Sequence, residues 1–461
     1  QQRHPTTKES RLETGPAYAL LGDSQRSKID SSAQRRSEWP VFRHDPARTG
    51  RTSGRVPSDL GRIWKANVGG QLTSPVVAAG KVLVAAKDTH SIHALDVASG
   101  NQVWQRIVGG LVDSPPTIDS GFAVFGCGDG WVYCLRVTDG ELVWRFRAAP
   151  EDLRTVVYGR VESLWPVTGS VLVRDGIVYC TAGRSSFLDG GMYLCRLDLR
   201  TGRLIGETRF DARDPVTGKQ REETVHDVEL PGALPDVLVD DGRYIYLRDI
   251  VLDYQGSQQD LFVPHLYCSA GLLDDSWWHR TSWLWGERNW GRASGWHVMP
   301  GIRPSGRILV TDDLTVFGFG RKSVRGSTLD DHRLFRVNKA VTEIDRSIKN
   351  NNVALAANQK PASLAYHWSR EVPLAVRSMA STEPILFAAG PIVGADSVGQ
   401  DEPRFDGDDP ARLFAFRTSD GATLSSTEIE SQPVFDGMAL AYEKLFMANV
   451  DGTIVCYGKS Q

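Results

Sequence analysis

Short apolar runs separated by turn residues recur along this chain. Lys81 to Ala86 and Ser91 to Asp96 are apolar or alternating runs of strand length, and a Ser-Gly turn leads from them to Gln102-Val103-Trp104. Runs of this length, bounded by Gly, Asp and Ser, predict β-strands joined by tight turns. About four such strands fit in each 40 residues.

The same unit repeats at a fixed interval. Trp64, Trp104 and Trp144 are spaced by 40 residues, and Gly100 recurs at Gly140. Weaker copies of parts of the unit follow, and they begin at Val171, Val237, Ile308 and Phe416. A period of this length indicates a repeat architecture in which each unit is one supersecondary element.

The two ends of the repeat region complement each other. Gly61 to Lys65 reads as the outer strand of a unit that lacks its first three strands, whereas the last unit stops at Tyr457 after its third. Pairing the two fragments closes a ring and leaves only short, protected sheet edges. We therefore predict an all-β fold, a single β-propeller of about seven four-stranded blades, with eight as the alternative, closed by the N-terminal strand near Trp64 on the C-terminal blade.

Two other architectures have a similar period. These are the WD40 propeller and the helical repeats, but the chain has no Trp-Asp or Gly-His dipeptide and little patterning at 3.6 residues. Both fit the sequence less well than the propeller described above.

The chain divides into an arm and a ring. Residues 1–38 are polar and lack the period, which predicts a flexible N-terminal arm or linker, and Trp39 to His44 are expected to lie against the ring. Residues 39–461 are assigned to the propeller, with inserts at about 148–163, 211–231, 255–303 and 339–363. Surface inserts of this kind commonly carry function.

The clearest units resemble a known repeat. The segments from His93 to Trp104 and from Tyr133 to Trp144 are similar to the tryptophan-docking repeat of quinoprotein-like propellers. In that family the Trp of one blade docks against the next blade near its Gly. The resemblance implies this docking role for Trp64, Trp104, Trp144, Gly100 and Gly140.

The family contains two kinds of member. Some are calcium-dependent alcohol dehydrogenases that use pyrroloquinoline quinone, and others are cofactor-free, such as the outer-membrane-protein assembly lipoprotein. The dehydrogenases carry two adjacent cysteines in a strained disulfide, whereas the six cysteines here include no adjacent pair, and no Glu, Asn and Asp trio matches the calcium site. The resemblance therefore implies the architecture without pyrroloquinoline quinone or calcium, nearer to the assembly factors.

Composition narrows the partners and the location. The formal net charge is -3, so no overall basic field favours nucleic acid, and no apolar run approaches the roughly 18 residues of a membrane span. The chain starts at Gln1 without a recognisable leader. We expect either a processed export signal or a longer parent protein, and the resemblance implies a periplasmic or otherwise exported bacterial protein.

The insert from Leu261 to Arg303 is the most distinctive segment, since it holds six of the 13 Trp residues. Trp rings could stack on a sugar or an aromatic ligand while charged groups orient it; alternatively, they form the core of a long loop. The candidates for ligand or partner binding are Trp277, Trp278, Trp283, Trp285, Arg288, Trp296 and His297. The candidates for catalysis are Asp275, His279 and Arg280. Their spacing matches no strong metal motif, so no metal site is predicted.

Three functions remain open from the sequence. The leading prediction is a non-catalytic propeller that binds a protein partner in a larger assembly, or a glycan, through its loop-decorated face. The first alternative is a carbohydrate-active enzyme or oxidoreductase with a site at the channel mouth beside the Trp-rich insert. The second is a quinone-dependent dehydrogenase with an atypical site.

Overall fold

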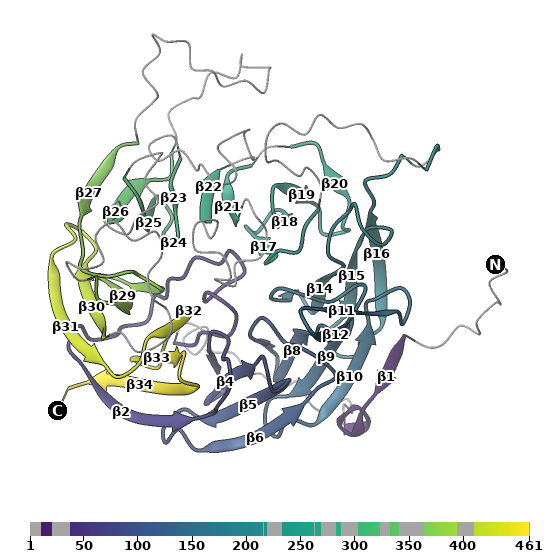
Figure 1. The fold of residues 1–461 in the computed structure, drawn as a ribbon, viewed down its shortest axis with the longest axis horizontal. Coiled ribbons are helices and arrows are strands. Elements are labelled where there is room, and N and C mark those ends of the chain that lie inside the picture. The colour runs from purple at the N-terminus through teal and green to yellow at the C-terminus, as the bar shows by residue number, and fades with distance from the viewer. Residues whose placement is uncertain are drawn as a thin grey trace, which may run out of the picture.

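The computed structural model describes residues 11–20, 37–214, 216–218, 233–261, 263–268, 283–286, 303–322, 332–340, 364–393 and 410–460. Within these ranges the sheets stand side by side around a central axis, like the blades of a propeller (Figure 1). Eight sheets form the ring, and a separate two-stranded hairpin projects from it. The predicted all-β propeller is confirmed, with eight blades.

The blades are numbered here in chain order. Blade 1 contains β3 (Val76–Ala78), β4 (Lys81–Ala86), β5 (Ser91–Asp96) and β6 (Gln102–Ile107), and blade 2 contains β7 (Thr117–Asp119), β8 (Phe122–Gly126), β9 (Trp131–Arg136) and β10 (Leu142–Arg147). Blade 3 contains β13 (Leu172–Arg174), β14 (Ile177–Ala182), β15 (Met192–Asp198) and β16 (Leu204–Phe210), and blade 4 contains β17 (Val239–Asp240), β18 (Ile245–Leu247), β19 (Ile250–Leu252) and β20 (Gln258–Gln259).

The second half of the ring follows the same order. Blade 5 is described by β21 (His265–Cys268), β22 (Trp283–Gly286) and β23 (Ser305–Gly306), and blade 6 contains β24 (Ile308–Thr311), β25 (Thr315–Arg321), β26 (His332–Asn338) and β27 (Tyr366–Arg370). Blade 7 contains β28 (Ser378–Thr382), β29 (Ile385–Pro391), β30 (Ala411–Arg417) and β31 (Thr423–Ile429). Blade 8 contains β32 (Pro433–Ala441), β33 (Lys444–Asn449), β34 (Thr453–Lys459) and, as its outer strand, β2 (Leu60–Asn67).

Blade 8 closes the ring as predicted. Its outer strand β2 comes from the N-terminal part of the chain and pairs antiparallel with β34, with Trp64 opposite Cys456. Because β2 and the last strand, β34, share one sheet, ring closure depends on a contact between residues nearly 400 positions apart.

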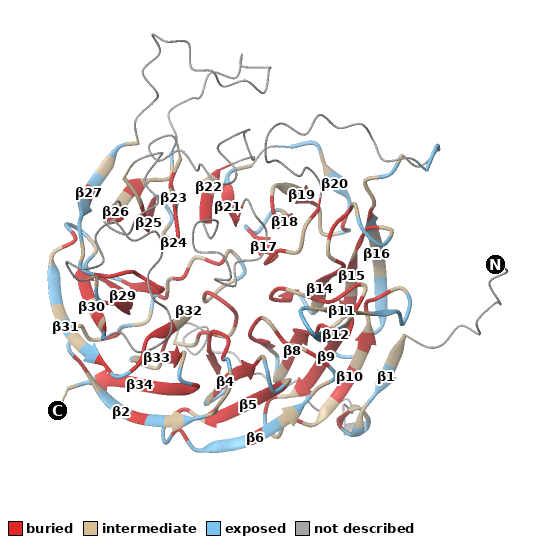
Figure 2. Cartoon of the chain, viewed as in Figure 1, coloured by how far each residue is buried: buried red, intermediate tan, exposed pale blue. Residues whose placement is uncertain are grey.

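Burial follows the position of a strand within its blade. All residues of the inner strand β3 are buried, whereas the outer strand β6 is exposed at most positions and buries Trp104. Figure 2 shows the same gradient around the ring, with buried residues on the inner strands and exposed ones on the rim. Inner strands read as continuous apolar runs because neighbouring blades cover both of their faces.

The N-terminal region departs from the expectation of a flexible arm. Within residues 1–38, the structure places β1 (Leu12–Thr14) and a short 3-10 helix, η1 (Pro16–Leu20), against blade 2. The segment docks because it completes backbone hydrogen bonds on an open sheet edge, a non-periodic contact that has no repeat signal.

The inserts are described only in part. The predicted insert at 148–163 contains the hairpin β11 (Arg154–Val157) and β12 (Arg160–Ser163). The insert predicted at 339–363 lies almost entirely outside the described residues, as do most residues of the inserts at 211–231 and 255–303.

The six cysteines are buried free thiols. Burial raises the pKa of Cys134 well above its usual range, so this thiol stays protonated at neutral pH and packs as a small apolar residue. In the described ranges, no helix is both long and apolar enough to cross a membrane.

Candidate functional site

The docking tryptophans fix each blade against the next one. The indole N–H of Trp104 in blade 1 donates to the carbonyl of Val137 in blade 2 at 2.9 Å, and Gly140 lies against the indole face. A Cβ at Gly140 would come within 2.6 Å of the ring, and the residue has a φ of +72°. Only glycine suits a position with both constraints.

The same contact recurs around the ring. The matching pairs are Trp64 with Gly100, Trp144 with Gly202 and Trp368 with Gly421, and the three indoles donate to the carbonyls of Val97, Leu199 and Thr418 at 2.9–3.1 Å. These residues therefore set the scaffold on which any binding surface is carried.

Residues 37–56, here called the axial segment, cross the middle of the ring. The segment contacts the inner strands of six blades, through hydrogen bonds or bridges to Val77, Ile118, Leu238, Asp240, Leu309, Thr311, Ser381, Asp436 and Tyr442. The prediction that Trp39 to His44 lie against the ring understated this arrangement, because the segment fills part of the central channel.

Two arginines of the axial segment are buried with their charge. Arg43 is 3% exposed, forms an ion pair with Asp436 at 2.5 Å, and donates to the carbonyl of Leu309. Its guanidinium also lies 4.9 Å from the ring centre of Trp283 in blade 5. This one side chain thus connects blades 5, 6 and 8 across the axis.

Arg48 is fully buried and donates to the carbonyls of Leu238 and Phe42 at 3.1 and 3.0 Å. Burial lowers its pKa to about 10, so the guanidinium remains charged at neutral pH. A buried charge of this kind is costly unless its donors are used. Here Leu238 beside blade 4 accepts from Nε and Phe42 of the axial segment accepts from Nη1, whereas Nη2 has no hydrogen-bond partner among the described residues.

Asp236 is the most perturbed carboxyl group near the axis. It is 2% exposed, its Oδ1 accepts the backbone N–H of Val237 at 2.7 Å, and its Oδ2 has no hydrogen-bond partner among the described residues. Burial raises its pKa to about 7, against smaller opposing effects of the Val237 N–H and the Arg248 charge, and the Asp249 charge raises it further. One buried carboxyl with a raised pKa does not by itself define a catalytic site.

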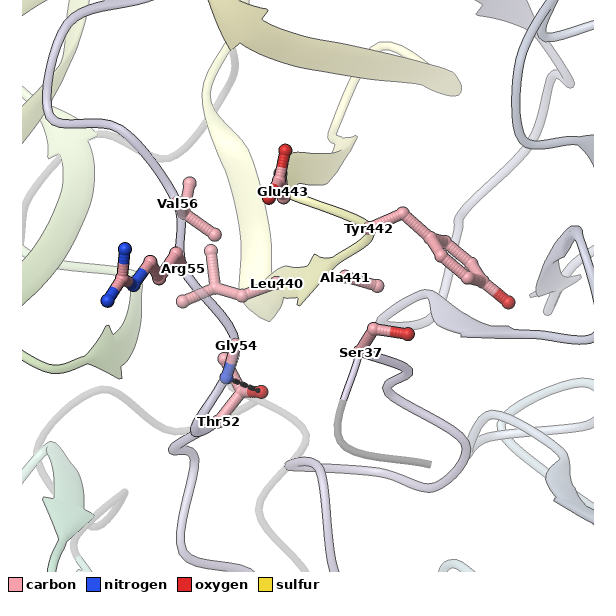
Figure 3. Close-up of a pocket in the computed structure, with 9 residues that line it drawn as sticks. All are labelled: Ser37, Thr52, Gly54, Arg55, Val56, Leu440, Ala441, Tyr442 and Glu443. Atoms are coloured by element: carbon pink, nitrogen blue, oxygen red, sulfur yellow. Dashed lines mark hydrogen bonds between the residues drawn. The ribbon is translucent and has the colours of Figure 1, made fainter. Parts of the chain in front are cut away.

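A small pocket lies where the axial segment leaves the ring. It has a volume of about 210 Å³ and is lined by Ser37, Thr52, Gly54, Arg55, Val56, Leu440, Ala441, Tyr442 and Glu443. Figure 3 shows Leu440 between the axial segment and the turn that carries Tyr442 and Glu443. A wider hollow of about 530 Å³ adjoins it and adds Pro57, Glu383, Pro384 and Lys459.

The described residues that line the two hollows include no His, Cys or Asp. Their charged side chains are Arg55, Glu383, Glu443 and Lys459. Elsewhere in the described ranges, no three or more His, Cys, Asp or Glu side chains are grouped as a metal site would require. The prediction that the protein uses neither quinone nor calcium stays a prediction.

The hairpin β11–β12 presents an apolar face to solvent. Val156 and Val161 are directly opposite each other in the register, so they share one face, and they are 68% and 59% exposed. Tyr158 at the turn is 98% exposed, and Leu153 at the base is 45% exposed. Clustered exposed apolar side chains of this kind mark interaction sites.

The other face of the hairpin lies toward the ring. Thr155, Val157 and Glu162 are half-buried, and burial raises the pKa of Glu162. At the root, the N–H of Ser163 donates to the carbonyl of Gly128 at 2.9 Å. The hairpin is therefore anchored on blade 2, and its apolar face is held outward.

The Trp-rich insert is described at two of its candidates. Trp283 is 1% exposed, in the core under Arg43, and Trp285 is half-buried with the Lys339 ammonium 4.0 Å from its ring centre. Trp283 thus packs as a core residue rather than facing a ligand. The remaining candidates lie outside the described residues: Asp275, Trp277, Trp278, His279, Arg280, Arg288, Trp296 and His297.

Sequence reasoning did not single out the axial arginines, Asp236 or the hairpin face. Arg43 and Arg48 have no pattern that distinguishes them from surface arginines, since their partners are distant in the sequence. The sequence could have predicted the exposed apolar face of the hairpin, because Val156, Tyr158 and Val161 lie in an insert that contains no apolar run for them to pack against.

Known proteins resemble the chain in part of its sequence and in its fold. A family model described as outer membrane protein assembly factor BamB matches residues 50–231. The BamB of Nitrosomonas eutropha is 35% identical over 161 residues, which cover 34% of each chain. The BamB of Yersinia pestis is 26% identical over 192 residues, which cover 40% of each chain. The matches thus span about a third to two-fifths of these curated relatives.

Solved structures support the fold alone. The quinohemoprotein alcohol dehydrogenase of Comamonas testosteroni is 15% identical with a TM-score of 0.51, and the match covers 96% of this chain and 84% of that one. A europium-containing methanol dehydrogenase is 10% identical with a TM-score of 0.53, covering 91% and 90%. The repeat and the docked tryptophans make the chain an eight-bladed β-propeller, similar in fold to these dehydrogenases and similar in sequence over residues 50–231 to the outer membrane protein assembly factor.

Proposed function

We propose that the chain is a non-catalytic binding propeller that docks a protein partner in an assembly of the bacterial envelope. The apolar face of the hairpin β11–β12 carries the proposal. The family model matched over residues 50–231 is described as an outer membrane protein assembly factor, and this range includes the hairpin. An exported, periplasmic location is part of the same proposal.

The hairpin suits a protein surface better than a small ligand. Its exposed face has Val156, Tyr158 and Val161 as an apolar centre, with Arg154 and Arg160 exposed beside it. An aromatic and aliphatic centre with charged residues at its rim is the usual anatomy of a protein interface. The partner is expected to offer an apolar patch of matching size.

The axial segment argues against chemistry at the end of the channel that it fills. Residues 37–56 contact the inner strands of six blades, with Arg43 and Asp436 paired and buried there. Substrate access at that level would require breaking a buried ion pair. A scaffold has no such requirement, because its binding surface is on the outside.

The test uses a photo-crosslinking amino acid at position 158 of the full-length protein in its own host. We expect one dominant covalent adduct, identified by mass spectrometry as an envelope assembly protein. The same probe at Leu314, which is 77% exposed on the turn between β24 and β25, is the matched control and should give no such adduct. Val156→Asp with Val161→Asp should abolish the adduct at 158.

Purified components make the test quantitative. Because a charge placed at the centre of an interface typically costs more than about 2 kcal/mol, the double variant should bind the identified partner at least about tenfold more weakly than the wild type. Equal binding by the two proteins, or equal adducts at positions 158 and 314, would contradict the proposal.

A further inference from the structure

The outer edge of blade 2 is paired, unlike the rim strands of the other described blades. β1 adds to β10 as a fifth, antiparallel strand, with Leu12 opposite Phe146 and Thr14 opposite Trp144. Backbone hydrogen bonds at both ends hold it, from the N–H of Arg147 to the carbonyl of Arg11 and from the N–H of Gly15 to the carbonyl of Val143, at 2.7 and 2.8 Å.

Arg11 anchors the segment through its side chain. Its guanidinium donates to the carbonyls of Arg147 and Ala148 at 2.8 and 3.0 Å, and it pairs with Glu207 of blade 3 at 2.7 Å. The same group lies 4.8 Å from the ring centre of Phe146. These contacts require a planar cation with several N–H donors. Arginine can therefore make them at position 11, and lysine cannot.

The following positions are equally selective. A Cβ at Gly15 would come within 2.2 Å of the carbonyl oxygen of Leu142, so only glycine fits there. Ala17 is 2% exposed in the core shared by blades 2 and 3. Trp144 beneath the segment is 0% exposed, compared with 7% for Trp104 at the same place in blade 1.

The edge of blade 2 therefore recognises a short sequence, Arg-x-x-x-Gly-x-Ala, and not merely any extended chain. We propose that this edge is a strand-docking site that residues 11–19 of a second copy can occupy in place of the chain's own, which links two propellers by exchange. A second copy is the occupant that the structure supports, because every copy carries the one strand seen to fit.

The connection to the ring is long enough for the exchange. Sixteen residues, 21–36, lie between η1 and the axial segment. A chain of this length spans at most about 55 Å when fully extended, which is enough to reach an adjacent propeller. A short tether gives the chain's own strand an effective concentration of about 1 mM, so at about 0.1 mM protein roughly one edge in ten is filled by another copy.

The test crosslinks a donor chain to an acceptor chain. The full-length donor carries Glu13→Cys, the full-length acceptor carries Arg145→Cys, and these two positions are opposite each other in the register. The native cysteines are buried, so a short bismaleimide reports on the introduced thiols. We expect a covalent dimer from the mixture.

Gln105→Cys in the acceptor is the matched control, since Gln105 is exposed and occupies the position of Arg145 in blade 1. The control mixture should give only the crosslinking of random collision. Equal amounts of dimer from the two mixtures would overturn the proposal.

Arg11→Ala separates strand exchange from a merely structural role of the segment. In the donor it weakens the donated strand and should lower the yield of dimer severalfold. In the acceptor it weakens the competing strand and should raise the yield. Opposite effects of one substitution in the two chains support the proposal, and effects of the same sign overturn it.

Discussion

Asp236 makes the stability of the propeller depend on pH in a way that one substitution should remove. The carboxyl group is 2% exposed at the inner strand of blade 4, and burial raises its pKa from 3.8 to about 7. Between these values the folded protein holds a proton that the unfolded chain has released. The free energy of unfolding therefore falls as the pH rises through this window.

The size of the effect follows from the width of the window. Each pH unit in the middle of the window changes the contribution by about 1.4 kcal/mol, and less near pH 7 where the folded group is half-ionised, so Asp236 should lower the free energy of unfolding by about 2.3 kcal/mol between pH 5 and pH 7. Asn keeps the shape of the side chain and stays neutral. We expect the stability of the Asp236→Asn variant, relative to the wild type, to increase by about this amount over the two units.

Urea unfolding at pH 5, 6, 7 and 8, followed by tryptophan fluorescence, measures the difference. Asp175→Asn is the control, because the side chain of Asp175 is 85% exposed and its variant should stay parallel to the wild type. If the Asp236→Asn variant also stays parallel, the carboxylate is ionised in the folded protein and the reasoning from burial is wrong.

Two further substitutions test the scaffold. Gly100→Ala should destabilise the protein by about 1–3 kcal/mol more than Gly80→Ala. Both residues have a φ near +70°, but only a Cβ at Gly100 would meet the indole of Trp64. Chemical unfolding of the two variants measures the difference. Arg43→Met should cost about 3–5 kcal/mol at neutral pH, because it leaves Asp436 buried without its partner, and adding Asp436→Leu should recover most of the loss. A double variant no more stable than Arg43→Met would contradict this account.

The repeat could be predicted from the sequence because the residues that define each unit lie close together in the chain. The spacing of Trp64, Trp104 and Trp144 reports the period directly, and the unmatched strand at Trp64 indicates how the ring closes. The docking geometry was also implied by the resemblance, since Gly100 and Gly140 stand at a constant distance from the next Trp. Blade count was less certain, because blade 5 retains little of the repeat pattern.

The positions of the axial segment and of β1 could not be predicted from the sequence, and the reason is the same for both. Arg43 finds its partner Asp436 across 393 positions, and Leu12 finds Phe146 across 134. Neither segment has a period of its own, so both resemble a polar linker in composition. Their conformations are determined by surfaces that exist only after the blades have folded.

The density of Trp residues in the insert at 255–303 identified an unusual segment, of which only Trp283 and Trp285 among the binding candidates lie in the described residues, so the other candidates stay predictions. Trp283 lies in the core, where its ring packs against the guanidinium of Arg43. The exposed apolar side chains that suit a protein partner are on the hairpin β11–β12. A large ring is as useful for packing as for recognition, and its sequence context does not separate the two. Exposure separates them: Tyr158 is 98% exposed on an anchored hairpin, and Trp283 is 1% exposed. For this propeller, the search for a partner therefore begins at the hairpin.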